Sequence, residues 1–218
     1  MTIMPGWPRD APMLTDRAAH VQVGLHLVLC DEQPLGKMPN SSIDGRLPAS
    51  SLLTRRALTG RLDTSEFGEE IDRQFDAFEQ AMGRPPDFVD GHKHCHLLPG
   101  LRTLVLDATV RRAPNAWLRS CADRLTAILA RPFRWKALGS ALWSLGFNRA
   151  ADRRRLNTND SFAGHYDYRR DFAALLLRFR ARPGRFHVIM CHPGSELDPS
   201  DPIAPARVKE FMLLKSGC

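Results

Sequence analysis

Apolar and polar residues alternate along this chain with two different periods. The pattern predicts strands at 21–29, 87–90 and 186–191 and helices at 65–82, 100–110 and 171–180. The helix at 65–82 has the clearest signal, because Ile71, Phe75 and Phe78 recur on one face and Thr64 or Ser65 can cap it. Strands that alternate with helices predict an α/β fold with a mostly parallel sheet.

Length and composition are those of one globular domain, residues 1–218, with 43% hydrophobic and 25% charged residues. No apolar stretch approaches the ~20 residues that span a bilayer, and the N-terminus lacks a basic and apolar leader, which favours a cytoplasmic protein. The five cysteines are scattered without CxxC spacing, so neither a disulfide framework nor a structural zinc site is indicated. Residues 34–51, rich in Pro, Gly and Ser, are a candidate lid or substrate loop.

The net charge of +7 is concentrated in one segment. Residues 111–155 contain eleven Lys or Arg and two acids, a balance of +9. Such a block attracts anions, whether nucleic acid, an anionic membrane surface or a phosphorylated substrate, although it is equally typical of a solvated helical face. No known nucleic-acid-binding motif accompanies it, which disfavours nucleic acid as the partner.

Three histidines lie at or near predicted strand ends, where α/β proteins gather functional residues. His26 lies late in the first strand, and His92 and His192 follow later strands. If the segment from Asp90 to His96 is extended, its alternate residues place one carboxylate and three imidazoles on one face. Imidazole suits Zn, Fe, Ni or Mn. The sequence therefore predicts one divalent-metal hydrolytic site.

Two other interpretations of these residues remain open. A single histidine is more often a core or surface residue than a ligand, and not every member of the run needs to bind metal. Cys191 beside His192 could be a nucleophile with its base, but neighbouring residues of a strand point to opposite faces.

Three motifs together resemble a known family. Gly-Leu-His-Leu at 24–27, Asp-x-His-x-His-x-His at 90–96 and Cys-His-Pro-Gly at 191–194 occur in the order and separation of the YdjC-like carbohydrate deacetylases. That family includes chitooligosaccharide deacetylases and deacetylases associated with hopanoid biosynthesis. Residues 23–29 and 159–164 are most similar to the hopanoid-associated branch.

The resemblance implies a TIM-barrel-like α/β fold and a metal-dependent hydrolase that removes the acetyl group from an N-acetylated sugar or sugar-lipid. It implies a divalent metal, usually described as magnesium, with zinc or another transition metal as the alternative. The metal ligands of the family fall on His26 and His92, and a catalytic residue, which could protonate the leaving amine, falls on His192. Contacts to the substrate or to the ligands fall on Asp90, His94, His96 and Asp160.

One family motif has no counterpart in this sequence. Family members begin with a strand that leads into Asp-Asp-Phe-Gly, whose aspartate is a metal ligand or base, whereas Met1–Gly6 resembles the second strand and its loop. None of Asp10, Asp16 and Asp31 occupies a comparable strand end. We therefore expect an N-terminally truncated barrel that holds metal poorly and has weak or absent deacetylase activity.

Two alternatives to an active deacetylase follow from the same residues. The fold could be inherited without catalysis, leaving a sugar-binding or regulatory protein. The metal cluster could instead serve a phosphoesterase, with the arginine-rich block binding phosphate. The basic block also suggests peripheral contact with an anionic membrane that carries a lipid-linked substrate.

Overall fold

The computed structural model describes residues 1–2, 14–15, 21–199 and 201–217, so Asp10 and Asp16 lie outside the described residues. The chain forms two compact units. The first contains Met1–Arg119 and Leu145–Thr158, and the second contains Ser120–Ser144 and Asn159–Cys218. The single domain predicted from the chain length stays a prediction.

A parallel three-stranded sheet lies at the centre of the first unit. Its strands are β1 (Leu25–Leu27), β2 (Phe88–Gly91) and β3 (Trp117–Leu118), in that order. Isolated parallel bridges join Thr2 to His26 and Leu118 to Thr158. The register of β1 and β2 sets His26 opposite Asp90, which is the pairing on which the candidate site depends.

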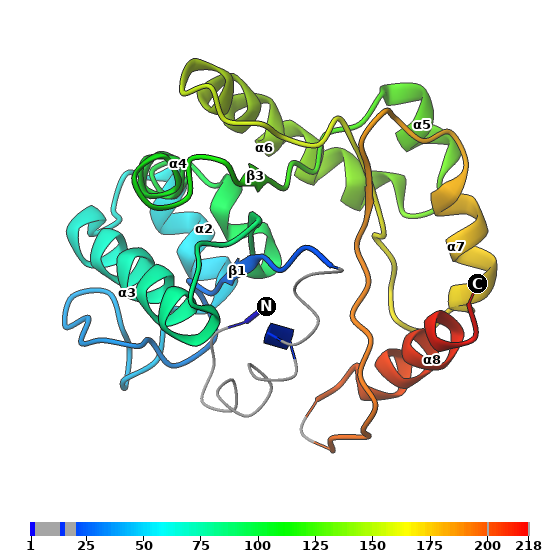
Figure 1. Ribbon diagram of the computed structural model, residues 1–218, viewed down its shortest axis with the longest axis horizontal. Helices are drawn as coiled ribbons and strands as arrows, with labels where there is room; N and C mark the ends of the chain where they lie inside the picture. The colour runs from blue at the N-terminus through cyan, green and yellow to red at the C-terminus, as the bar shows by residue number, and fades with distance from the viewer. Residues whose placement is uncertain (3–13, 16–20, 200, 218) are drawn as a thin grey trace. The chain divides into compact units, whose positions relative to one another are not determined.

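Helices α2 (Ser50–Leu58), α3 (Thr64–Met82) and α4 (Leu101–Arg112) belong to the first unit, and α3 packs against α4 (Figure 1). The side chain of Asp63 caps α3 by accepting a hydrogen bond from the amide of Glu66, and Gly83 ends the helix in the left-handed conformation. The predicted apolar face is buried, with Ile71 and Phe75 fully inaccessible to solvent. The apolar periodicity of α3, its Asp63 cap and Gly83 at its end therefore account for the position of this helix.

A second face of α3 organises the segment that follows β1. Three buried side chains four residues apart bind the main chain of that segment: Gln74 binds Val28, Glu70 binds Leu35 and Gly36, and Glu66 binds Asn40. Gln74 Oε1 accepts from the N–H of Val28 (2.9 Å), and Gln74 Nε2 donates to the carbonyl of the same residue (2.8 Å). Because these groups then cannot join the sheet, β1 ends at Leu27 and the predicted strand at 21–29 is too long.

The second unit contains a two-stranded parallel sheet, β4 (Ser161–Ala163) and β5 (His187–Ile189). Its helices include α5 (Leu125–Ala130), α7 (Phe172–Arg180) and α8 (Ala204–Lys215), and α7 packs against α8 (Figure 1). Helix α6 (Arg134–Arg153) contributes residues to both units. The core of the second unit consists of Ala163, Tyr166, Phe172, Leu175, Leu176 and Phe179.

The prediction of an α/β fold with parallel strands is confirmed. The described strands form two small open sheets and do not show a closed barrel, so the barrel-like arrangement stays a prediction. Within the described part of the chain, no helix has both the length and the apolar character needed to cross a membrane.

Candidate active site

His26 and Asp90 form the central contact of the candidate site. Their strands are parallel and in register, and His26 Nδ1 lies 2.6 Å from Asp90 Oδ1. A carboxylate can only accept, so the ring hydrogen of His26 lies on Nδ1 and the lone pair of Nε2 is directed away from Asp90. Carboxylates orient metal-binding histidines in this way.

Arg119 follows β3 and holds the other side of Asp90. Its Nε donates to Asp90 Oδ2 at 2.7 Å, and one terminal nitrogen donates to the Gly91 carbonyl at 2.8 Å. Burial alone would raise the pKa of Asp90, but the charge of Arg119 and the interaction with His26 hold that pKa well below its usual value. Asp90 is therefore a charged carboxylate with both oxygens engaged.

The histidine run does not continue as a strand. Residues His92–Leu97 form a 3₁₀ segment, η2, in which Lys93 and His94 have φ angles of 48° and 60°. The prediction that Asp90, His92, His94 and His96 share one extended face is wrong. The turn separates the three imidazoles, so each has different surroundings.

His92 remains beside His26, and their ring centroids are 5.8 Å apart in an edge-to-face arrangement. His94 Nδ1 lies 2.7 Å from a terminal nitrogen of Arg119. Because a guanidinium has only donors, Nδ1 of His94 is the acceptor, and Nε2 carries the ring hydrogen.

His96 is fully buried, and its Nε2 donates to the Arg119 carbonyl at 2.8 Å. Burial, reinforced by the charge of Arg119, lowers the pKa of His96 to about 3, so this histidine is neutral. These surroundings support a role in holding the arginine, whereas the predicted contact with substrate would require exposure.

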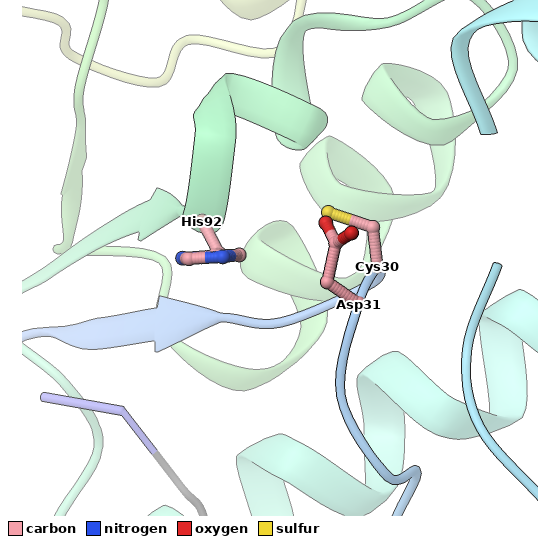
Figure 2. Close-up of side chains that lie close together, drawn as sticks. All are labelled: Cys30, Asp31 and His92. Carbon is pink, nitrogen blue, oxygen red and sulfur yellow. The ribbon is translucent and has the colours of Figure 1, made fainter. Parts of the chain in front are cut away.

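Cys30, Asp31 and His92 form a second cluster of donor atoms. One ligand atom from each lies within 4.8 Å of the other two. Figure 2 shows Cys30 and Asp31 on the segment after β1, with His92 at the end of β2 facing them. Asp31 also accepts from Lys93 Nζ at 3.1 Å and from the Ser50 amide at 3.3 Å.

The surroundings of Cys30 and Asp31 determine which of the two is ionised. Burial raises the pKa of the Cys30 thiol, to which Cys95 and Asp31 add. Burial opposes ionisation of Asp31 as well, but hydrogen bonds from Cys30 and Lys93 lower the pKa of this carboxyl. The cluster thus contains a protonated thiol that donates to an ionised carboxylate.

A sequence model described as YdjC-like protein matches residues 1–217. The chain belongs to the YdjC-like protein family. A chitooligosaccharide deacetylase of Serratia marcescens is 38% identical to it over 100 residues, which are 46% of this chain and 39% of that protein. A chitooligosaccharide deacetylase of Yersinia pestis (strain Pestoides F) is 41% identical over 83 residues, which are 38% and 32% of the two proteins. The matched segments thus span well under half of these relatives.

A solved structure has a fold similar to that of this YdjC-like protein. A protein of Enterococcus faecalis V583, provisionally described as a cellobiose-phosphate cleavage protein, superposes with a TM-score of 0.67 and 18% sequence identity. The superposition covers 99% of this chain and 79% of the other. At this level of identity the likeness shows a shared fold only.

His192 of this YdjC-like protein lies in the second unit, three residues beyond β5. Its amide donates to the buried carboxylate of Glu210, whose other oxygen accepts from the Tyr166 hydroxyl. Its carbonyl lies 3.4 Å from a terminal nitrogen of Arg207, and its ring meets that of Tyr168 edge to face at 5.5 Å. The His-Pro turn is therefore held by α8.

Asp160 also lies in the second unit, directly before β4. Its two oxygens accept from the amides of Arg185 (3.2 Å) and Phe186 (3.0 Å). These bonds hold the chain that enters β5. The roles predicted for Asp160 and His192 stay predictions.

Three residues that hold these sites together were not among the site residues predicted from the sequence. Arg119 appeared only as part of the basic block, although its position after a short strand was a usable signal. Asp31 was set aside for lack of a strand end, yet it lies four residues after β1 and close to His92. Glu210 is a single acid in an otherwise apolar or basic helix, and nothing in the sequence pairs it with His192.

Proposed function

We propose that this protein hydrolyses the acetamide of an N-acetylated sugar, with a divalent metal bound at His26 and His92. The observation that carries the proposal is the chain of contacts from Arg119 through Asp90 to His26, beside the ring of His92. The deacetylases named among its relatives support the substrate class.

The described residues fit a divalent metal. Because His26 Nδ1 donates to Asp90, the lone pair of His26 Nε2 is left to bind a metal ion. The ring centroids of His26 and His92 are 5.8 Å apart, which allows both imidazoles to bind one ion. Such an ion, when bound, lowers the pKa of a coordinated water and polarises the acetyl carbonyl.

The other candidate residues of the first unit have separate roles in the proposed reaction. Asp90 fixes the ring orientation of His26, and Arg119 keeps Asp90 charged and in place. His94, with its ring hydrogen on Nε2, can donate to an oxygen of the substrate. His96 stays neutral and holds the carbonyl of Arg119.

His192 is proposed as the acid that protonates the leaving sugar amine. Its support is the family motif and the way in which its turn is fixed by Glu210. General acids depend on positioning to within hydrogen-bond reach of the leaving group, and a buried carboxylate bound to the backbone of the turn supplies that rigidity.

The test is release of acetate and free amine from N-acetylglucosamine oligosaccharides, followed by mass spectrometry with magnesium, zinc or a chelator present. We expect His26→Gln and His92→Gln to abolish release, and Asp90→Asn to reduce it by roughly 10–100-fold. Glu69→Gln is the matched control, because Glu69 is 63% exposed on α3.

Two outcomes would contradict the proposal. Release that persists unchanged in His26→Gln and His92→Gln would remove these residues from the reaction. Histidine-dependent sugar binding without release from any N-acetylated sugar would support a binding or regulatory protein instead.

A further inference from the structure

We propose that Cys30, Asp31 and His92 form a binding site for a borderline divalent cation such as Zn²⁺, with Cys30 as a thiolate ligand. The inference adds donors to the site of the proposed deacetylase and rests on that function for its purpose. It goes beyond the two histidines because it brings in the segment that follows β1.

The distances allow such a site. Donor atoms bound to one tetrahedral zinc ion at about 2.0–2.3 Å lie roughly 3.5 Å from one another. The three donor atoms here already lie within 4.8 Å of one another. Closing the difference takes a movement of about 1 Å, which side-chain rotation supplies without a change in the backbone.

The backbone that presents these donors is fixed from two sides. The segment containing Cys30 and Asp31 is bound through its main chain by α3, and the amide of Asp31 itself donates to the Pro48 carbonyl. His92 starts the η2 turn, directly after a strand that pairs with β1. The donors therefore come from two neighbouring strand ends, as in other sites at the edge of a parallel sheet.

The donor types point to a borderline metal. Thiolate and imidazole ligands select zinc and similar ions, whereas magnesium prefers oxygen donors and retains its water molecules. A zinc ion holds a coordinated thiol in the deprotonated form even where burial disfavours the thiolate. Cys30, Asp31 and His92 alone would leave one tetrahedral position, which His26 or water would take.

Lys93 acts as a competitor for the same carboxylate. Its ammonium group lies 3.1 Å from Asp31 Oδ2, where it would repel an incoming cation. The side chain is half exposed, so it can swing away when a metal binds. Replacing Lys93 with a neutral residue should consequently favour the metal.

The experiment titrates the metal-free protein with Co²⁺, followed by absorption spectroscopy, and with Zn²⁺, followed by isothermal titration calorimetry. We expect a thiolate-to-cobalt charge-transfer band in the wild type that disappears in Cys30→Ser. Zinc affinity should fall by about tenfold or more in Cys30→Ser, Asp31→Asn and His92→Gln, and should rise several-fold in Lys93→Gln. Cys121→Ser is the matched control, because this buried thiol belongs to the second unit and lies outside the cluster.

The outcomes separate this proposal from the deacetylase. A missing charge-transfer band, or zinc affinity unchanged in Cys30→Ser, would overturn the site even if acetate release depends on His26. A thiolate band with Asp31-dependent affinity would support the site even if no acetylated sugar is hydrolysed. Far-UV circular dichroism of each variant shows that the fold is retained.

Discussion

Removing the side chain of Arg119 should destabilise the first unit strongly. Arg119 is 4% exposed, and its guanidinium donates to the Asp90 carboxylate, to His94 and to the Gly91 carbonyl. In Arg119→Ala the carboxylate of Asp90, whose side chain is only 16% exposed, loses its main positive partner. The substitution therefore leaves an uncompensated charge in the protein interior.

The expected magnitude follows from that charge. Breaking a buried ion pair from one side costs about 3–5 kcal/mol of unfolding free energy. Arg119→Lys keeps the positive charge but cannot reach all three acceptors at once, so we expect about 1–3 kcal/mol. In Arg119→Ala combined with Asp90→Asn the orphaned charge is absent, and the double variant should be more stable than the sum predicts by about 1–3 kcal/mol.

Urea unfolding followed by far-UV circular dichroism and tryptophan fluorescence measures these differences. Coincidence of the two probes checks that unfolding is two-state. Arg111→Ala is the control, since Arg111 forms an ion pair with Asp72 but is 55% exposed, and it should cost no more than about 1 kcal/mol. A cost below about 1 kcal/mol for Arg119→Ala, or additivity of the double variant within ~0.5 kcal/mol, would refute the reasoning.

Two further predictions concern buried polar groups. In Glu210→Gln the amide cannot accept from both the His192 amide and the Tyr166 hydroxyl with the strength of a carboxylate. The unfolding free energy of the second unit should therefore fall by about 1–3 kcal/mol. Thermal or urea unfolding measures this change, and an unchanged midpoint would contradict it. His96 has its pKa lowered by burial to about 3, so between that pH and its unfolded pKa of ~6.5 the unfolded chain binds the extra proton. Stability should therefore be complete above that window and fall as the pH drops through it, at up to ~1.4 kcal/mol per pH unit, and His96→Gln should show a shallower slope over the same range.

Elements with strong local signals were predictable from the sequence. Helix α3 differs from its predicted range by one residue, because its apolar period and Gly83 act locally. Its cap was predicted wrongly, since Asp63 caps the helix and not Thr64 or Ser65. The strand before His92 and the parallel arrangement were predictable for the same reason. The length of β1 was not, since it is limited by Gln74, which lies 46 residues away along the chain.

In the candidate site, too, locally encoded features were predictable and those set by distant residues were not. His26, Asp90 and His92 come together because strand register places them, and alternation along a strand can be recognised in a sequence. The left-handed turn at Lys93 and His94 could not be foreseen, because lysine does not favour it and because the turn is held by Arg119, which follows another strand.

The contacts from α3 to the segment after β1 have a consequence for how this protein can change during evolution. Its buried side chains at four-residue spacing bind amides and carbonyls of the loop, not loop side chains. The path of the loop is thus encoded in the helix. Exposed loop residues such as Gln33 and Lys37 can be exchanged without altering the route of the backbone. By contrast, a single-residue insertion in α3 would rotate its binding face by about 100° and release the whole segment.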